Sequence, residues 1–126
     1  MAALSGIMTE EVFTVATGTA VTQVAEAMVR GRFGSALVMS GPMLIGILTE
    51  RDVLRAASSG ADLSSSPASK WMTPDPVTAP PDLDSEEAAE TMLTHGFRHL
   101  PVVDGGRVVG IVSLRDLLSA HVRRRR

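Results

Sequence analysis

The sequence contains no cysteine and no tyrosine, and only 3% of its 126 residues are aromatic. The absence of cysteine excludes disulfides, thiolate catalysis and cysteine-based zinc sites. The scarcity of aromatic residues leaves no stripe on which single-stranded bases could stack. The core must therefore consist of aliphatic residues, with the seven methionines as adaptable filler.

Long hydrophobic runs are absent as well. No segment approaches the roughly 18 apolar residues that a membrane span requires, and the opening stretch MAALSGIMTEEVFTV lacks a basic region followed by a long apolar run. A chain of this length can bury a sizeable core. We therefore expect a soluble, cytoplasmic protein without a membrane partner.

Positive charge is scarce outside the C-terminus. Four of the 12 basic residues are Arg123 to Arg126, which leaves eight basic residues against 14 acidic ones and a net charge of −6 for the rest of the chain. An acidic body argues against a broad nucleic-acid surface. We interpret residues 123–126 as a solvated basic tail. The alternative, nucleic-acid binding through this tail, predicts an affinity that depends steeply on salt.

One segment of the sequence occurs twice. GILTERDVL, at residues 46–54, recurs as GIVSLRDLL, at residues 110–118. The same offset of 64 pairs many other positions, among them Met8-Thr9 with Met72-Thr73, Thr14 with Thr78, Phe33 with Phe97, and Val38 with Val102. A register sustained over that length indicates an internal duplication. We divide the chain into a first repeat (1–60), a linker (61–68), a second repeat (69–122) and the basic tail.

Each repeat shows the same order of expected elements. A short extended segment precedes a segment with apolar residues at helical spacing; two β-rich segments joined by a tight turn follow, and the repeated motif then opens a second helix. The expected bounds are 11–15, 21–28, 35–39 and 44–48 in the first repeat, and 75–79, 88–93, 99–103 and 107–112 in the second. The sequence thus predicts a mixed α/β fold of two β-α-β-β-α repeats, related by a pseudo-twofold axis with clefts between them.

The repeated motif has two interpretations. Thr49 and Asp52 stand where a helix N-cap and its capping-box acid belong, as do Ser113 and Asp116, so capping alone would explain them. However, each motif also places a cation in the first helical turn, where it opposes the helix dipole.

These cations are Arg51 and Arg115, and a bound phosphate would make both favourable. The carboxylates of the motif would then suit the hydroxyls of a ribose. We therefore favour a nucleotide as the ligand of the motif.

A further pair of basic residues occurs in the second repeat only. Arg98 and His99 directly precede an expected strand, whereas the aligned residues of the first repeat are Gly34 and Ser35. Two solvated polar residues at a strand edge would be the simpler explanation. Taken with the two motifs, however, the pair favours phosphate binding.

The whole chain resembles a tandem pair of CBS domains, the module named after cystathionine β-synthase. The likeness rests on IMTEEVFTV with WMTPDPVTA, on HLPVVD, and above all on the doubled glycine-apolar-apolar-Ser/Thr-x-x-Asp segments. This resemblance implies a regulatory, non-enzymatic module that binds adenine nucleotides or adenosyl compounds between the repeats. The implied ligand is AMP, ADP or ATP, with S-adenosylmethionine or NADH as further possibilities, and the implied assembly is a homodimer with an unidentified effector protein.

The resemblance also implies roles for individual residues. Asp52 and Asp116 would hold ribose hydroxyls, and Thr49 and Ser113 would bind ribose or phosphate. The purine pocket would be lined by Thr14 and Thr78, while Arg98 and His99 fall where phosphate-binding members carry basic residues. Because the first repeat lacks that basic pair, we expect one strong site and one weak or empty site. The alternative function is a dimerisation scaffold without ligand, in which the motifs are helix caps only.

Overall fold

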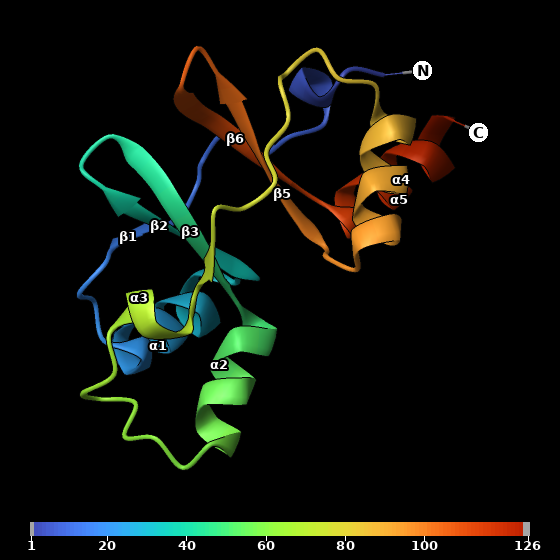
Figure 1. The fold of residues 1–126 in the computed structure, drawn as a ribbon. Helices are drawn as coiled ribbons and strands as arrows, with labels where there is room; N and C mark the ends of the chain where they lie inside the picture. The colour runs from blue at the N-terminus through green and yellow to red at the C-terminus, as the bar shows by residue number, and fades with distance from the viewer. Residues whose placement is uncertain (1, 125–126) are drawn as a thin grey trace. The chain divides into compact units, whose positions relative to one another are not determined.

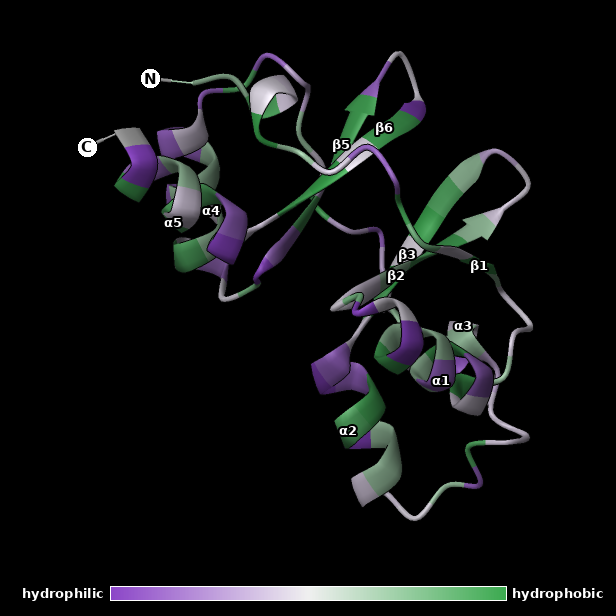
Figure 2. Ribbon diagram, turned by 180° about the vertical axis from the view of Figure 1, so that it is seen from behind, coloured by the Kyte–Doolittle hydropathy of each residue, from purple (hydrophilic) through white to green (hydrophobic). Residues whose placement is uncertain are grey.

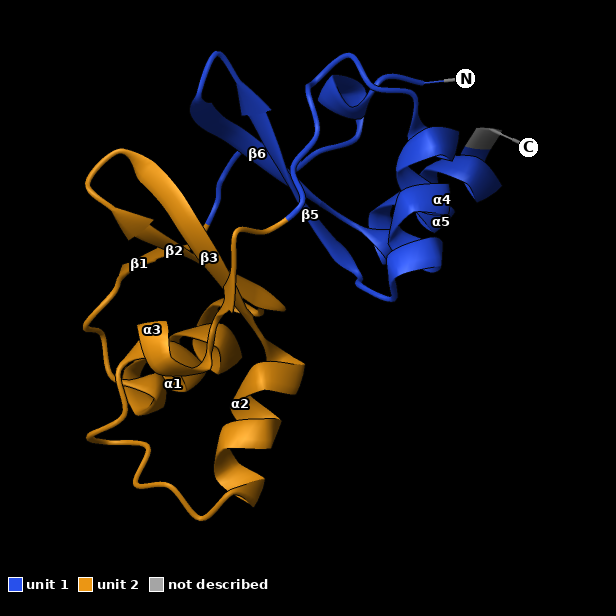
Figure 3. Ribbon diagram, in the orientation of Figure 1, with its two compact units in different colours: residues 1–12, 77–126 blue, residues 13–76 orange. Residues whose placement is uncertain are grey.

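The structure, a computed structural model, describes residues 2–124. The chain forms two compact units, one built from Met1–Val12 with Val77–Arg126 (unit 1) and the other from Phe13–Pro76 (unit 2; Figure 3). The last two residues of the predicted basic tail lie outside the described part, whereas residues 123 and 124 continue the final helix.

Unit 2 contains a four-stranded sheet with strand order β1-β2-β3-β4 (Figure 1). Strand β1 is parallel to β2, and the other neighbours are antiparallel. The elements are β1 (Thr14–Ala16), α1 (Val21–Gly31), β2 (Ser35–Ser40), β3 (Met43–Thr49), α2 (Glu50–Ser58), α3 (Ala68–Trp71) and β4 (Thr73–Pro74).

Unit 1 repeats this plan with less regular strands. Its hairpin of β5 and β6 is antiparallel, and an isolated parallel bridge from Ala79 to Val102 takes the place that β1 has in unit 2. The elements are a short 3-10 helix (Leu4–Gly6), α4 (Ser85–His95), β5 (His99–Asp104), β6 (Arg107–Ser113) and α5 (Leu114–Arg124). The mixed α/β fold with two repeated units is confirmed.

The hairpins of the two units share even their irregularities. The register of β2 against β3 shifts after Val38, and that of β5 against β6 shifts after Val102, the residue aligned with Val38. Figure 2 shows the strands as mainly hydrophobic and the helices as divided between hydrophobic and hydrophilic residues. The duplication of the sequence therefore reproduces the backbone in detail.

Each unit contains the opening segment of the other repeat. Thr9, near the start of the first repeat, pairs with Ile111 of β6 through two backbone hydrogen bonds of 2.9 Å. Correspondingly, Thr73 pairs with Ile47 of β3. The compact units consequently do not coincide with the sequence repeats, because the first 12 residues pack in the unit formed by the second repeat.

Each unit has an aliphatic core between its sheet and its helices. Most of the apolar positions that the helical spacing predicted in α1 and α4 are buried, but Leu93 of α4 is exposed. The hairpin strands β2 and β5 bury consecutive residues rather than alternate ones. The core of unit 1 is formed by Leu4, Ala79, Ala88, Met92, Leu100, Val102, Val112 and Leu117. The core of unit 2 is formed by Val24, Met28, Ala36, Val38, Leu48 and Ala68.

The segment predicted as a linker, 61–68, is fastened to unit 2. Its carbonyls at Leu63 and Ser66 accept the N–H groups of Thr22 and Val21 at the start of α1. The side chain of Asp62 accepts hydrogen bonds from the hydroxyl (2.6 Å) and the N–H (3.1 Å) of Ser64, and these bonds lower the pKa of Asp62. The segment thus supplies missing partners to a helix N-terminus that has no side-chain cap.

Candidate functional site

The motif of the first repeat forms a closed capping box at the start of α2. The carboxylate Oδ2 of Asp52 accepts the backbone N–H of Thr49 at 2.9 Å, and the Asp52 N–H donates to the Thr49 hydroxyl at 3.3 Å. The Thr49 hydroxyl also donates to the same Oδ2, at 3.1 Å. Asp52 is 5% exposed. The predicted cap is therefore real, and it uses much of the polar capacity of both side chains.

The motif of the second repeat forms the same cap at the start of α5, with fewer bonds. The Ser113 N–H donates to Oδ2 of Asp116, and the Asp116 N–H donates to the Ser113 hydroxyl, both at 3.0 Å. Ser113 and Asp116 are half-buried. Within the described residues, neither the hydroxyl proton of Ser113 nor Oδ1 of Asp116 has a hydrogen-bond partner. This motif therefore presents one donor and one carboxylate oxygen that the cap does not use.

The backbone holds Arg98 and His99 beside the second motif. The carbonyl of Arg98 accepts the N–H of Leu114, the first residue of α5, at 2.8 Å. His99 is the register partner of Ser113 across the hairpin. His99 is half-buried, whereas Arg98 is exposed. Unit 1 thus brings together the basic pair, the hydroxyl and the carboxylate that the sequence analysis singled out.

Unit 2 has the same backbone arrangement without the basic side chains. The carbonyl of Gly34 accepts the N–H of Glu50 at 3.2 Å, and Ser35 is the register partner of Thr49. The two motifs thus occupy equivalent backbone sites and differ in charge. Of the predicted cations, the motif of the first repeat retains Arg51 and lacks the basic pair.

The remaining predicted site residues lie at the surface of their units. Arg51 and Arg115 are exposed in the first turns of α2 and α5, and no ion pair joins either of them to a described residue. Thr14 is exposed in β1, opposite Leu37 of β2. Thr78 is exposed and adjoins Ala79, whose N–H donates to the carbonyl of Pro101 at 3.0 Å.

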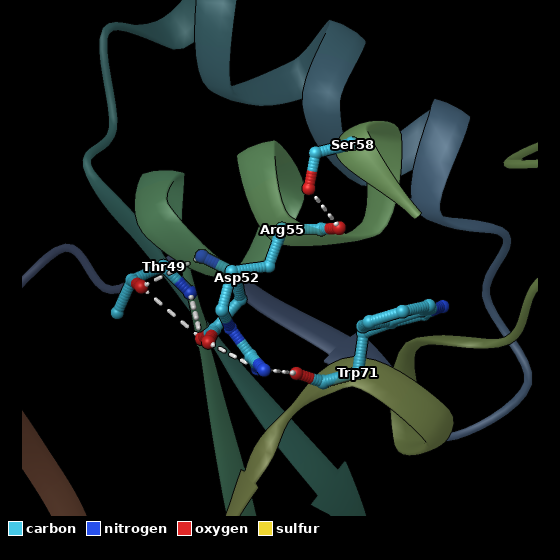
Figure 4. Close-up of polar contacts among 5 residues, drawn as sticks. All are labelled: Thr49, Asp52, Arg55, Ser58 and Trp71. Atoms are coloured by element: carbon cyan, nitrogen blue, oxygen red, sulfur yellow. Dashed lines mark hydrogen bonds and ion pairs between the residues drawn. The ribbon is translucent and has the colours of Figure 1, made fainter. Parts of the chain in front are cut away.

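Sequence reasoning missed one residue of the first motif, Arg55. Its Nη2 donates to Oδ1 of Asp52 at 3.0 Å, which forms the ion pair drawn in Figure 4. The signal available in the sequence was the loss of symmetry at this position, because the aligned residue of the second repeat is Ser119.

Two further features bear on the chemistry of the described residues. They include no group of three or more His, Asp or Glu side chains that could hold a metal ion. They also include no helix that is both long and apolar enough to cross a membrane. What the motifs present is a helix N-terminus, hydroxyls, a carboxylate and arginines, which are groups able to bind an anion and a diol.

Known proteins resemble this chain over nearly its whole length. An uncharacterised 17.7 kDa protein of Acidianus ambivalens is 39% identical over 93% of this chain and 71% of its own length. The CBS domain-containing protein YhcV of Bacillus subtilis is 35% identical over 93% of this chain and 84% of its own length. The CBS domain protein PAE2072 of Pyrobaculum aerophilum, solved in complex with AMP, is 26% identical and matches with a TM-score of 0.85 over 97% of this chain and 99% of that one.

The CBS domain family matches the chain twice, at residues 4–59 and at residues 68–123. These two matches follow the duplication seen in the sequence and the doubled hairpin and helix of the fold. The chain belongs to the CBS domain family and carries a pair of these domains.

Proposed function

We propose that this protein is a regulatory module, not an enzyme, that binds an adenine nucleotide or a related adenosyl compound and transmits its occupancy through a partner. The observation that carries the proposal is the second motif. There, Oδ1 of Asp116 and the Ser113 hydroxyl keep hydrogen-bonding capacity beyond the cap, and Arg98 lies next to the same helix start. The AMP complex of the related Pyrobaculum aerophilum protein supports an adenosyl ligand.

In the proposed complex, the residues around α5 divide the ligand between them. The carboxylate of Asp116 accepts the ribose hydroxyls, because an ionised carboxylate is an acceptor with about four lone-pair sites. The phosphate lies near the N-terminus of α5, where free N–H groups and the helix dipole favour an anion. Arg98 and Arg115 then neutralise its charge, and Thr78 contributes to the purine pocket.

Thermal unfolding of the purified protein tests this function. The panel contains AMP, ADP, ATP, S-adenosylmethionine and NADH, with GMP and GTP as controls for purine identity. A ligand at a hundredfold excess over its Kd adds about 2.7 kcal/mol of stability, which raises Tm by several degrees at this size. A rise with adenine compounds and none with guanine compounds is the expected result. No rise with any compound would leave the dimerisation scaffold as the function.

We further propose that the protein acts as a homodimer in the cytoplasm. Paired helices in each unit expose large apolar side chains at matching positions, Val29 and Leu54 in unit 2 and Leu93 and Leu118 in unit 1. Leu93 and Leu118 border an apolar groove between α4 and α5. A second copy of the chain is the occupant that fits, because a surface of this kind repeated within one chain can pair with itself in an isologous contact.

The proposed location in the cytoplasm is supported by the absence of cysteine, which fits a reducing compartment.

A further inference from the structure

The two aligned carboxylates receive different numbers of hydrogen bonds. Asp52 accepts three, from the N–H and the hydroxyl of Thr49 at Oδ2 and from Nη2 of Arg55 at Oδ1. Asp116 accepts one, from the N–H of Ser113 at Oδ2, as far as the described residues show. Asp52 is also the more deeply buried of the two. The carboxylates are thus equivalent in position but not in availability.

Arg55 is held against Asp52 by a second residue. Its Nη2 lies 3.5 Å from the carbonyl oxygen of Trp71, and its guanidinium carbon lies 5.9 Å from the centre of the Trp71 ring, within the range of a cation–π contact. Figure 4 shows the guanidinium between the Asp52 carboxylate and the Trp71 backbone. The residues aligned with this pair are Ser119 and Ile7, which cannot form such an arrangement.

The difference can be expressed in acceptor capacity. A carboxylate offers about four lone-pair sites, and the two hydroxyls of a ribose need two of them. Asp52, with three donors bound, can accept one more hydroxyl before an existing bond must break. Asp116 can accept both hydroxyls without breaking any bond. A ribose at Asp52 must therefore displace either Arg55 or the cap.

We propose that Arg55 determines the order in which the two motifs are filled, by occupying the Asp52 carboxylate so that the first nucleotide binds at Asp116. This inference rests on the proposed function and adds to it a specificity-determining residue. It is independent of the missing basic pair in the first repeat, because it concerns the ribose contact rather than the phosphate contact. Arg55 acts here as a positioning residue, since it controls the carboxylate and does not touch the ligand.

Calorimetric titration of the full chain with AMP tests the order of filling. Compared with the wild-type protein, the variant Asp116→Asn should lose the tighter of the two AMP-binding events, and the variant Asp52→Asn should keep it. Arg55→Ser, which copies the second repeat, should strengthen the weaker event by about fivefold, since a partly exposed ion pair contributes up to about 1 kcal/mol. That gain should disappear in Arg55→Ser combined with Asp52→Asn. The matched control is Arg30→Ser, an exposed arginine of the same unit, which should change neither event.

The possible outcomes separate this inference from the function on which it rests. Equal losses from Asp52→Asn and Asp116→Asn, or an unchanged second event in Arg55→Ser, would overturn the role of Arg55 while leaving nucleotide binding in place. An absence of binding by the wild type and by every variant, for AMP and for the other adenosyl compounds of the panel, would overturn the proposed function itself. The stability of each variant, measured by thermal unfolding without AMP, shows whether the titrated protein is folded.

Discussion

The side chain of Met8 covers Gly110 so closely that a Cβ atom added to this glycine would lie 2.6 Å from the methionine sulfur. The same relationship joins Met72 to Gly46 in the other unit. In both cases the opening segment of one repeat packs closely against a strand glycine of the other repeat. This contact fixes where that segment lies against the hairpin.

Gly110→Ala is therefore expected to destabilise the protein by about 1–3 kcal/mol, the usual cost of overpacking a well-filled site. Met8 can move, but the added atom would also lie 3.0 Å from the backbone oxygen of Thr9, which is fixed by its pairing with Ile111. Chemical denaturation measures the change. Gly18→Ala is the control, because nothing lies within 4 Å of a Cβ there; equal effects of the two substitutions would contradict the close contact.

Arg32 and Gly96 end equivalent helices in the same left-handed conformation, at φ 58° and φ 76°. Glycine adopts this conformation without the steric cost that a side chain brings. We expect Arg32→Gly to stabilise the protein by roughly 0.5–1 kcal/mol, and Gly96→Ala to destabilise it by about 1 kcal/mol. Urea denaturation of both variants gives the comparison. Effects of the same sign would show that the C-caps are not equivalent.

Asp116→Asn separates the ligand role of this residue from its role as a cap. The amide oxygen can still accept the Ser113 N–H, so stability should fall by less than about 1 kcal/mol. The loss of the charged acceptor should weaken AMP binding at least about tenfold, because a hydrogen bond to a charged group contributes about 1.5–3 kcal/mol. Titration with AMP provides the measurement, and Asp104→Asn, at the exposed end of β5 in the same unit, is the control. Affinities that match in the two variants would remove Asp116 from the site.

Arg98→Ala is expected to discriminate between ligands with and without phosphate. Affinity for AMP and ATP should fall about tenfold from the loss of one charged contact, whereas affinity for adenosine should stay within about twofold. The control is Arg107→Ala, which removes an exposed arginine from the far end of the same hairpin. A loss of the same size for adenosine would mean that Arg98 supports the fold of the site and does not bind phosphate.

Leu93→Glu tests the proposed dimer. Leu93 is 68% exposed on α4, so the substitution should leave the unit folded. In a dimer that covers this face, the new charge would be buried without a partner, and the dimer Kd should rise about 30-fold or more. Sedimentation velocity across a concentration series measures the change. Met43→Glu, at the exposed start of β3 in unit 2, should have no effect. A wild-type protein that is monomeric throughout the series would refute the dimer directly.

Most of the fold could be predicted from the sequence because the duplication doubles every signal. The hairpin strands and the helices α1, α2, α4 and α5 occur within a few residues of their expected places, since the apolar spacing and the turn glycines recur in both repeats. The short helices Leu4–Gly6 and α3 were not expected, and α3 begins in the segment predicted as a linker. The spacing of Asp84 and Glu87 in the sequence predicts a capping box at the start of α4, and this prediction is only half right. Asp84 does cap α4, but it accepts from the N–H of Glu86, and no reciprocal bond from Glu87 is formed. Local spacing does not decide between the neighbouring N–H groups of a first turn.

What the sequence could not predict was the contact between segments far apart in the chain. The pairing of Thr9 with Ile111 and the placement of Trp71 beside Arg55 depend on how the chain returns to each hairpin. The spacing of apolar residues along a helix or strand does not predict such long-range contacts. The candidate residues around Asp116 were predictable because they adjoin one another across a single hairpin. The role of Arg55 was not, because its function depends on a residue from another element.

The exchange of opening segments has a consequence for biosynthesis. Unit 2 is one continuous stretch, Phe13–Pro76, so all of it has been made once residue 76 has left the ribosome. Unit 1 must wait, because Thr9 finds its strand partner only when Ile111 emerges. Domains fold as units during synthesis, N-terminal parts first. In this protein the order is reversed for residues 1–12, which are synthesised before unit 2 and reach their final place after it.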